Sequence, residues 1–199
     1  MSEEKTAAIK KIQASGQMRK IMADYFYALN RASEEGHPKV AWCTSVGPAE
    51  LLLSLGFVVY YPENHSAMLG STRTANTTIP AANAIGYSPD ICSYLTSDIG
   101  AYIKRETPLS RAYEGIRSVP KPDVLVFNTN QCRDVQDWFN WYSRELKVPA
   151  LGISTYLNIG QITADHLRGI VHQIEGLIPP LEKISGRMFD IDRLRSVMA

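Results

Sequence analysis

Two cysteines, Cys92 and Cys132, stand where a thiol can do chemistry as well as fill a core. Cys92 follows a turn signal at residues 88–90 and directly precedes a helical pattern. Cys132 follows the predicted strand 123–128 and also precedes a helical pattern, so it marks a junction between a strand and a helix. Such junctions in α/β proteins face the ligand crevice, and the N-terminal end of a helix stabilises a thiolate. Two thiolates that converge there would suit a metal ion or an iron–sulfur cluster.

The spacing of these cysteines keeps an ordinary interpretation open. They are 40 residues apart, whereas compact zinc and ferredoxin motifs hold neighbouring ligands about two to four residues apart. A site that uses both must therefore be assembled by the fold, and on the residues alone two ordinary buried thiols are the simpler interpretation. The third cysteine, Cys43, lies beside Ala41 and Trp42 within an apolar run and is predicted to be a core residue.

The elements that must position these residues alternate along the chain. Four apolar runs predict strands, at residues 40–45, 57–61, 123–128 and 148–154. Helical patterns cover residues 3–34, 48–55, 91–104 and 133–146. This alternation predicts an α/β fold, with a parallel sheet flanked by helices and an N-terminal helical segment. Residues 75–85 fit either a helix or a loop.

The chain divides into three predicted parts: a helical segment at 1–38, an α/β domain with the cysteines at 39–160, and a helical part at 161–199. In the last part Thr163 is expected to cap a helix that Pro179-Pro180 interrupts, and Asp190 to cap a final helix. The final helical pattern is still in register at the last residue. The chain therefore either ends in a helix, or is the first half of a longer polypeptide whose residues 161–199 lead toward a second, similar domain.

The bulk composition excludes several classes of partner. The 199 residues carry a formal net charge of +1, which gives no electrostatic reason to expect a nucleic acid or an anionic membrane. There is no apolar run near the roughly 20 residues needed to span a bilayer, and no signal-peptide pattern. Three cysteines are poor material for a disulfide framework, so we expect a reducing, cytoplasmic location.

Common α/β motifs are missing from the sequence. It contains no phosphate-binding loop of the type G-x-x-x-x-G-K-[ST], no G-x-G-x-x-G after the first strand, and no G-x-S-x-G. This argues against nucleotide binding of the P-loop kind, a dinucleotide-binding Rossmann domain and a hydrolase with a nucleophile elbow.

Three further polar residues are candidates for a catalytic role. Ser45 and Glu50 lie at the first junction between strand and helix, where both could face a substrate, although Glu50 also fits an ordinary first-turn residue favoured by the helix dipole. His65 follows the second predicted strand, in a predicted loop, and could donate a proton. Its alternative is a structural or solvated histidine.

Several motifs in combination resemble one family. They are residues 44–51, residues 87–100 around Cys92, the junction at Cys132, and residues 186–194. From Lys39 to the C-terminus the chain resembles the 2-hydroxyacyl-CoA dehydratase / benzoyl-CoA reductase family, particularly the B-type subunits of benzoyl-CoA reductase.

The resemblance implies a cofactor, partners and a reaction. Family members pair with a sister subunit and hold an iron–sulfur cluster, commonly 4Fe–4S. An ATP-hydrolysing activator with its own cluster supplies one low-potential electron. The acyl-CoA thioester then becomes a ketyl-type radical anion, which loses a 2-hydroxyl group or undergoes ring reduction. Cys92 and Cys132 match the two cluster cysteines of the first domain, and the third family cysteine would lie beyond this chain.

We therefore expect a subunit, or the N-terminal part of one, of an iron–sulfur acyl-CoA dehydratase or reductase. Ser45, Glu50 and His65 are its candidate catalytic residues, and Cys92 and Cys132 its cluster ligands. Two alternatives stay open: a non-catalytic subunit that stabilises a catalytic sister chain, and a thiol-containing binding domain without a cluster.

Overall fold

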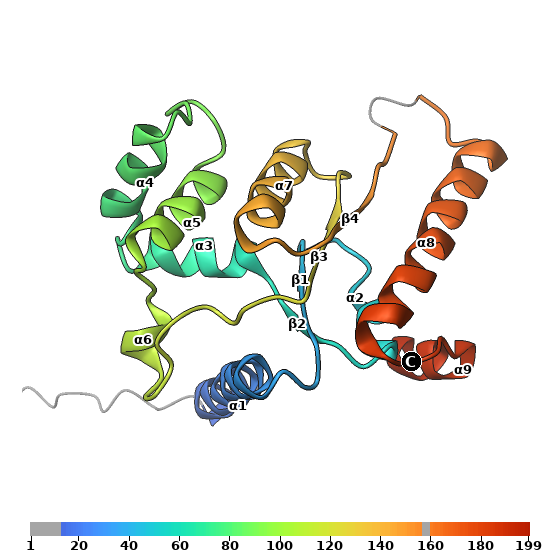
Figure 1. Cartoon of the computed structure of the whole chain (residues 1–199), viewed down its shortest axis with the longest axis horizontal. Coiled ribbons are helices and arrows are strands. Elements are labelled where there is room, and N and C mark those ends of the chain that lie inside the picture. Colours follow the sequence, from blue (N-terminus) through green and yellow to red (C-terminus); the bar gives the residue numbers. More distant parts are fainter. Residues whose placement is uncertain (1–12, 157–159) are drawn as a thin grey trace, which may run out of the picture.

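Four parallel strands form the sheet, in the order β2-β1-β3-β4 (Figure 1). In the computed structural model, which describes residues 13–156 and 160–199, the strands are β1 (Val40–Cys43), β2 (Val58–Tyr60), β3 (Val124–Asn128) and β4 (Ala150–Ile153). Trp42 of β1 lies opposite Tyr60 of β2 on one side and Leu125 of β3 on the other. The predicted α/β fold with a parallel sheet is confirmed.

Helices cover both faces of the sheet, as a parallel sheet requires. One face carries α1 (Gln13–Glu35), α3 (Pro62–Ser71), α4 (Ala75–Ala84), α5 (Ser93–Lys104), α6 (Leu109–Ala112) and α7 (Asp134–Leu146). The other face carries α2 (Ala49–Ser54), α8 (Ala164–Ser185) and α9 (Ile191–Met198). The part of the N-terminal helix predicted before Gln13 lies outside the described residues.

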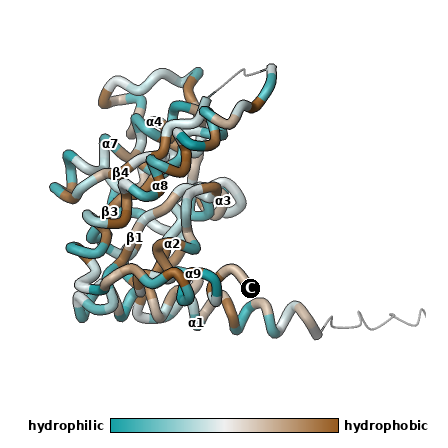
Figure 2. Tube along the Cα trace, turned by 90° about the vertical axis from the view of Figure 1, so that its right-hand side faces the viewer, coloured by the Kyte–Doolittle hydropathy of each residue, from teal (hydrophilic) through white to brown (hydrophobic). Residues whose placement is uncertain are grey.

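The strands divide the core into two clusters because successive side chains point to opposite faces. Trp42 and Phe127 contribute to the cluster under α5 and α7. Cys43 and Val126 contribute to the cluster under α2 and α8. In Figure 2 hydrophobic stretches run along β1 and β3, the two central strands. Burial on both sides explains why these strands are continuous apolar runs in the sequence.

A helix follows almost directly after the second strand, so the prediction of a loop at residues 62–65 is wrong. Tyr61 is extended and Pro62 begins α3. Proline suits the first helical position because its φ angle is already helical and the missing N–H has no intrahelical acceptor there. His65 therefore lies on a helix rather than in a loop. Residues 75–85, for which the sequence allowed helix or loop, form α4.

The C-terminal part confirms the predicted caps but not the predicted break. The Thr163 hydroxyl accepts the His166 N–H at 3.4 Å, and the Asp190 carboxylate accepts the Asp192 N–H at 2.9 Å. The interruption predicted at Pro179-Pro180 is wrong, because α8 runs through both prolines to Ser185. Leu177 and Leu181, on either side of them, are buried against the sheet, and this packing holds the helix where its hydrogen bonds are lost.

Helices α4 and α5 approach each other closely at Gly100, and the addition of one methyl group at this residue tests the contact. A Cβ at Gly100 of α5 would overlap the carbonyl oxygen of Thr78 in α4. We expect Gly100→Ala to lower the free energy of unfolding by about 1–3 kcal/mol, the cost of overpacking. Gly70→Ala is the matched control, since Gly70 is helical and has no atom within 4 Å of such a Cβ. Urea denaturation checks both, and equal stability of the two variants would contradict the expected contact.

Among the described residues, no helix has both the length and the apolar character that crossing a membrane requires.

Candidate functional site

The order of the strands places a topological switch point at one end of the sheet, where a ligand crevice is expected. The chain passes from β1 outward to β2, and then returns to the other side of β1 to form β3. At such a switch point the connections leave in opposite directions, and a crevice opens outside the carboxyl ends of the two strands. Ser45 follows β1, and Cys132 follows β3. Two predicted site residues therefore flank this crevice.

Cys92 lies at the N-terminal end of a neighbouring helix. It is the N-cap residue of α5, and its carbonyl oxygen accepts the Thr96 N–H at 3.1 Å. Cys132 stands two residues before Asp134, where α7 begins. Both thiols are free and partly exposed. The predicted placement of both cysteines at helix starts is confirmed.

The helices behind the two cysteines run in the same direction. Asp98 of α5 pairs with Trp138 of α7, and one turn further on Tyr102 pairs with Trp141. Residue numbers rise together along both helices, so their N-terminal ends lie at the same end of the layer (Figure 1). Asp98 and Trp138 each follow their cysteine by six residues, and Cys132 lies two residues before α7 begins. Cys92 and Cys132 therefore both lie at the N-terminal end of this helix pair.

The loops after β1 and β3 are tied to each other and to α3. The Asn128 side-chain amide donates to the Val46 carbonyl at 3.2 Å, and the Asn128 N–H donates to the Thr44 hydroxyl at 3.1 Å. The Ser45 N–H donates to the Glu63 carboxylate in the first turn of α3. These hydrogen bonds hold the two loops and the start of α3 together, and these segments form the rim of the expected crevice.

Ser45 and Glu50 are both exposed on the β1–α2 side of this rim. Glu50 occupies the first turn of α2, which is also where a carboxylate stabilises the helix dipole. Both side chains can be reached from solvent, and their roles in catalysis stay predictions.

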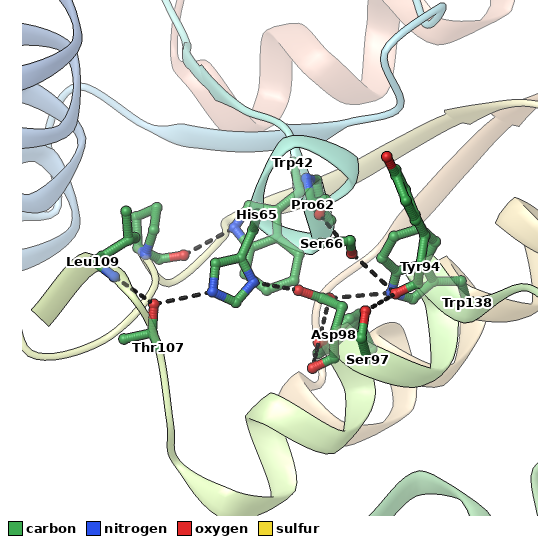
Figure 3. Close-up of polar contacts among 12 residues, drawn as sticks. Trp42, Pro62, His65, Ser66, Tyr94, Ser97, Asp98, Thr107, Leu109 and Trp138 are labelled. Carbon is green, nitrogen blue, oxygen red and sulfur yellow. Dashed lines mark hydrogen bonds and ion pairs between the residues drawn. The ribbon is translucent and has the colours of Figure 1, made fainter. Parts of the chain in front are cut away.

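His65 lies in a buried polar network, drawn in Figure 3. Its Nδ1 is 2.6 Å from Oδ1 of Asp98, and its Nε2 is 3.0 Å from the Thr107 hydroxyl. The Thr107 oxygen also accepts the Leu109 N–H at 3.2 Å. A neutral ring with its proton on Nδ1 satisfies all these partners: it donates to Asp98 and accepts from Thr107. Both ring nitrogens are thus engaged, and a role of His65 as proton donor to a substrate stays a prediction.

Asp98 is a functional candidate that the sequence did not reveal. The carboxylate is buried, at 3% exposed, and accepts two further bonds at Oδ2, from Trp138 Nε1 at 3.2 Å and the Tyr142 hydroxyl at 2.6 Å. Burial and the Asp98 carboxylate hold the pKa of Tyr142 well above its usual range, so the phenol stays a donor. Its signals in the sequence are its place in the motif at residues 87–100 and its position beside Ile99 in a helical pattern.

A cavity of about 640 Å³ opens beside this network. Its lining includes Trp42, Thr107 and Tyr142. It also includes residues 120–122, which precede β3, residues 101–103, in the last turn of α5, and residues 105 and 106, just after it. The cavity therefore lies toward the amino ends of the strands, away from the cysteine end, and is separate from the crevice.

Cys43 is a core residue, as predicted. It is fully buried, and a Cβ on Gly47 would stand 2.5 Å from its sulfur. Burial, and then the nearby Glu63 and Glu50 carboxylates, raise the pKa of the Cys43 thiol far above its usual range. It is therefore a poor nucleophile and a poor metal ligand.

The difference between the thiols predicts a labelling pattern. At pH 8, N-ethylmaleimide should modify Cys92 and Cys132 in the folded protein and leave Cys43 unmodified, because only a reachable thiolate reacts. Unfolding in urea should add the third label. Peptide mass spectrometry checks this, and labelling of Cys43 before either of the others would contradict it.

The donor set suits part of a cluster site. Soft thiolates are the ligands that iron–sulfur clusters use, and Cys92 and Cys132 provide two thiols just before the starts of neighbouring parallel helices. Across residues 13–156 and 160–199 no group of three or more His, Cys, Asp or Glu side chains converges on one point. The described residues therefore fit two ligands of a cluster and not a complete set.

Comparison with known proteins points to one family. The family model for the 2-hydroxyglutaryl-CoA dehydratase D-component matches residues 44–199 of the sequence. The (R)-2-hydroxyisocaproyl-CoA dehydratase alpha subunit of Clostridioides difficile is 32% identical over 199 residues, which cover 100% of this chain and 45% of that protein. The benzoyl-CoA reductase B-type subunit of Thauera aromatica is 28% identical over 200 residues, with the same coverage of both chains. The chain thus spans about half the length of these relatives.

Proposed function

Because the chain belongs to the family of the 2-hydroxyglutaryl-CoA dehydratase D-component, we propose that it forms part of an enzyme that dehydrates or reduces an acyl-CoA thioester. The relatives are named as alpha subunits of dehydratases and as the B-type subunit of a reductase. These names support a subunit that works with a sister chain. They include both reaction types, dehydration of a 2-hydroxyacyl group and reduction of an aromatic acyl group.

The observation that carries this proposal is the placement of Cys92 and Cys132. Both thiols are partly exposed at the starts of the parallel helices α5 and α7, and soft thiolate sulfur is the ligand that iron–sulfur clusters use. We assign these two side chains as ligands of a 4Fe–4S cluster. The remaining protein ligand would come from residues outside those described or from another chain. When bound, such a cluster supplies one-electron transfer.

The rim of the crevice would bind the substrate. Ser45 and Glu50 are exposed after β1, beside the loop that leads to Cys132. The Ser45 hydroxyl can donate a hydrogen bond to a thioester carbonyl, and the Glu50 carboxylate can accept a substrate proton. His65 reaches a substrate only if Thr107 releases its Nε2.

The test is an anaerobic assay of the assembled enzyme. The chain is combined with a sister subunit and an ATP-hydrolysing iron–sulfur activator, and then offered 2-hydroxyacyl-CoA thioesters and benzoyl-CoA in parallel. We expect ATP-dependent turnover of one of the two classes. Binding of acyl-CoA without turnover of either class, in an assembly with an active activator, would contradict the proposal.

A further inference from the structure

The buried carboxylate of Asp98 links α5 and α7, the helices that begin just after the two partly exposed cysteines. Asp98 belongs to α5 and accepts hydrogen bonds from His65 of α3 and from Trp138 and Tyr142 of α7. A third helix is thereby tied to α5 and α7. Ser66 of α3 adds a bond to the Tyr94 carbonyl of α5 at 2.9 Å.

The hydrogen bonds of Asp98 align α5 with α7 along their length, and the two cysteines lie just before the starts of these helices. Asp98 follows Cys92 by six residues, and its partner Trp138 follows Cys132 by six residues. A slide of α5 against α7 by one residue would shift one thiol past the other by about 1.5 Å. The hydrogen bonds of Asp98 oppose such a slide because they are directional, whereas apolar contacts tolerate it.

Stability alone does not require a carboxylate at this position. Burying a charge costs free energy, and an apolar residue of similar volume is often as stable in such a place. The side chain is nevertheless fully engaged, with both oxygens bonded. A buried polar network whose members are all hydrogen-bonded makes a core more rigid and favours one arrangement of it.

The hydrogen-bond network of Asp98 also extends, through α3, to the rim of the expected crevice. Helix α3 holds Asp98 through His65 and, half a turn earlier, accepts the Ser45 N–H through Glu63. Hydrogen bonds therefore connect α5 and α7 to the Asp98 carboxylate directly, and connect the loop after β1 to it through α3. We propose that Asp98 is a positioning residue that sets the distance between the Cys92 and Cys132 thiols. This inference deepens the proposed function and rests on it for its purpose, although its test uses no iron.

The test measures how readily one reagent bridges the two thiols. Dibromobimane becomes strongly fluorescent only when it has reacted with two thiols, and monobromobimane reports the reactivity of each thiol separately. The second attack is intramolecular, so its rate depends on the placement of the thiols. The 199-residue chain is treated at pH 8, and the bridged peptides are identified by mass spectrometry.

Three variants separate positioning from packing and from stability. Asp98→Leu keeps the volume and removes the acceptors. Asp98→Asn keeps an acceptor for Trp138 and Tyr142, and its amide can donate to the other tautomer of His65. Leu181→Ala weakens the core on the opposite face of the sheet, where Leu181 is fully buried.

We expect the wild-type chain to form the Cys92–Cys132 bridge. In Asp98→Leu the bridging rate should fall about tenfold or more, with the monobromobimane rates unchanged. Asp98→Asn should stay within about threefold of wild type because its hydrogen bonds re-form. Leu181→Ala should bridge like wild type despite its lower melting temperature.

Several results would overturn the inference. A bridging rate in Asp98→Leu equal to that of wild type would make Asp98 a packing residue only. An equal loss in Leu181→Ala would show a general loosening of the fold, and a wild-type chain that forms no bridge would show thiols out of reach of each other. A chain that bridges as expected but binds no iron would support the positioning role and count against the cluster, so the two failures are distinguishable.

Discussion

Replacing Cys92 or Cys132 by alanine will lower acyl-CoA turnover by the assembled enzyme at least about a hundredfold, because the proposed cluster loses a thiolate ligand. Among the described residues no His, Cys, Asp or Glu side chain joins these two cysteines to make a set of three ligands. Cys43→Ala should keep at least about half of the turnover, since the Cys43 thiol is buried and protonated. The measurement is the anaerobic, ATP-dependent rate with the sister subunit and the activator present.

This comparison also separates a catalytic from a structural subunit. The two cysteine variants and the Cys43 control should assemble with the sister chain to the same extent, as gel filtration can show. If an assembled Cys92→Ala or Cys132→Ala enzyme turned over at the wild-type rate, the cluster assignment would be wrong. The chain would then serve as a non-catalytic partner.

Trp42→Ala will lower the free energy of unfolding by about 3–5 kcal/mol, the usual cost of deleting a large buried aromatic side chain. The Trp42 ring packs against Tyr60 and Tyr142, with ring centroids 5.2 and 4.8 Å away. Its indole N–H donates to the Pro120 carbonyl at 2.8 Å. The variant therefore creates a cavity at the centre of the sheet and also leaves a buried carbonyl without its donor.

Trp141→Ala is the matched control for this effect. The Trp141 ring is partly exposed and has its edge contacts with Tyr102 and Tyr142. We expect a loss of only about 1–2 kcal/mol in urea denaturation. An equal loss in both variants would contradict the placement of Trp42 in the central layer.

The strands and the cysteine junctions could be predicted because their signals are local. A parallel strand buried on both faces is a continuous apolar run, as residues 124–127 are. The turn at residues 88–90 and the apolar run before Cys132 mark the points where helices begin. Element positions then follow from alternation of strands and helices, without knowledge of which side chains touch.

Local signals fail at prolines, because a proline is compatible with more than one local structure. Pro62 fits the end of a strand, and it is also a favoured first residue of a helix. Pro179 and Pro180 indicate a break, yet Leu177 and Leu181 on α8 are buried on the sheet. Packing against the sheet outweighs the local cost of proline.

The network of Asp98 could not be predicted because its partners are distant in the sequence. His65 lies 33 residues before it, and Tyr142 lies 44 residues after it. In a single sequence an acid on a helix is most simply a solvated residue. Only the packing of α3, α5 and α7 shows that this carboxylate is buried and has three donors.

The most direct test of the account is the iron and acid-labile sulfide of the anaerobically purified assembly of this chain with its sister subunit. It should be measured for the wild type and for the Cys92→Ala/Cys132→Ala double variant. We predict iron, sulfide and the visible charge-transfer absorption of an iron–sulfur cluster in the wild type, and their loss from this chain's site in the double variant. Equal iron and sulfide in the two assemblies, or none in the wild type, would contradict the account.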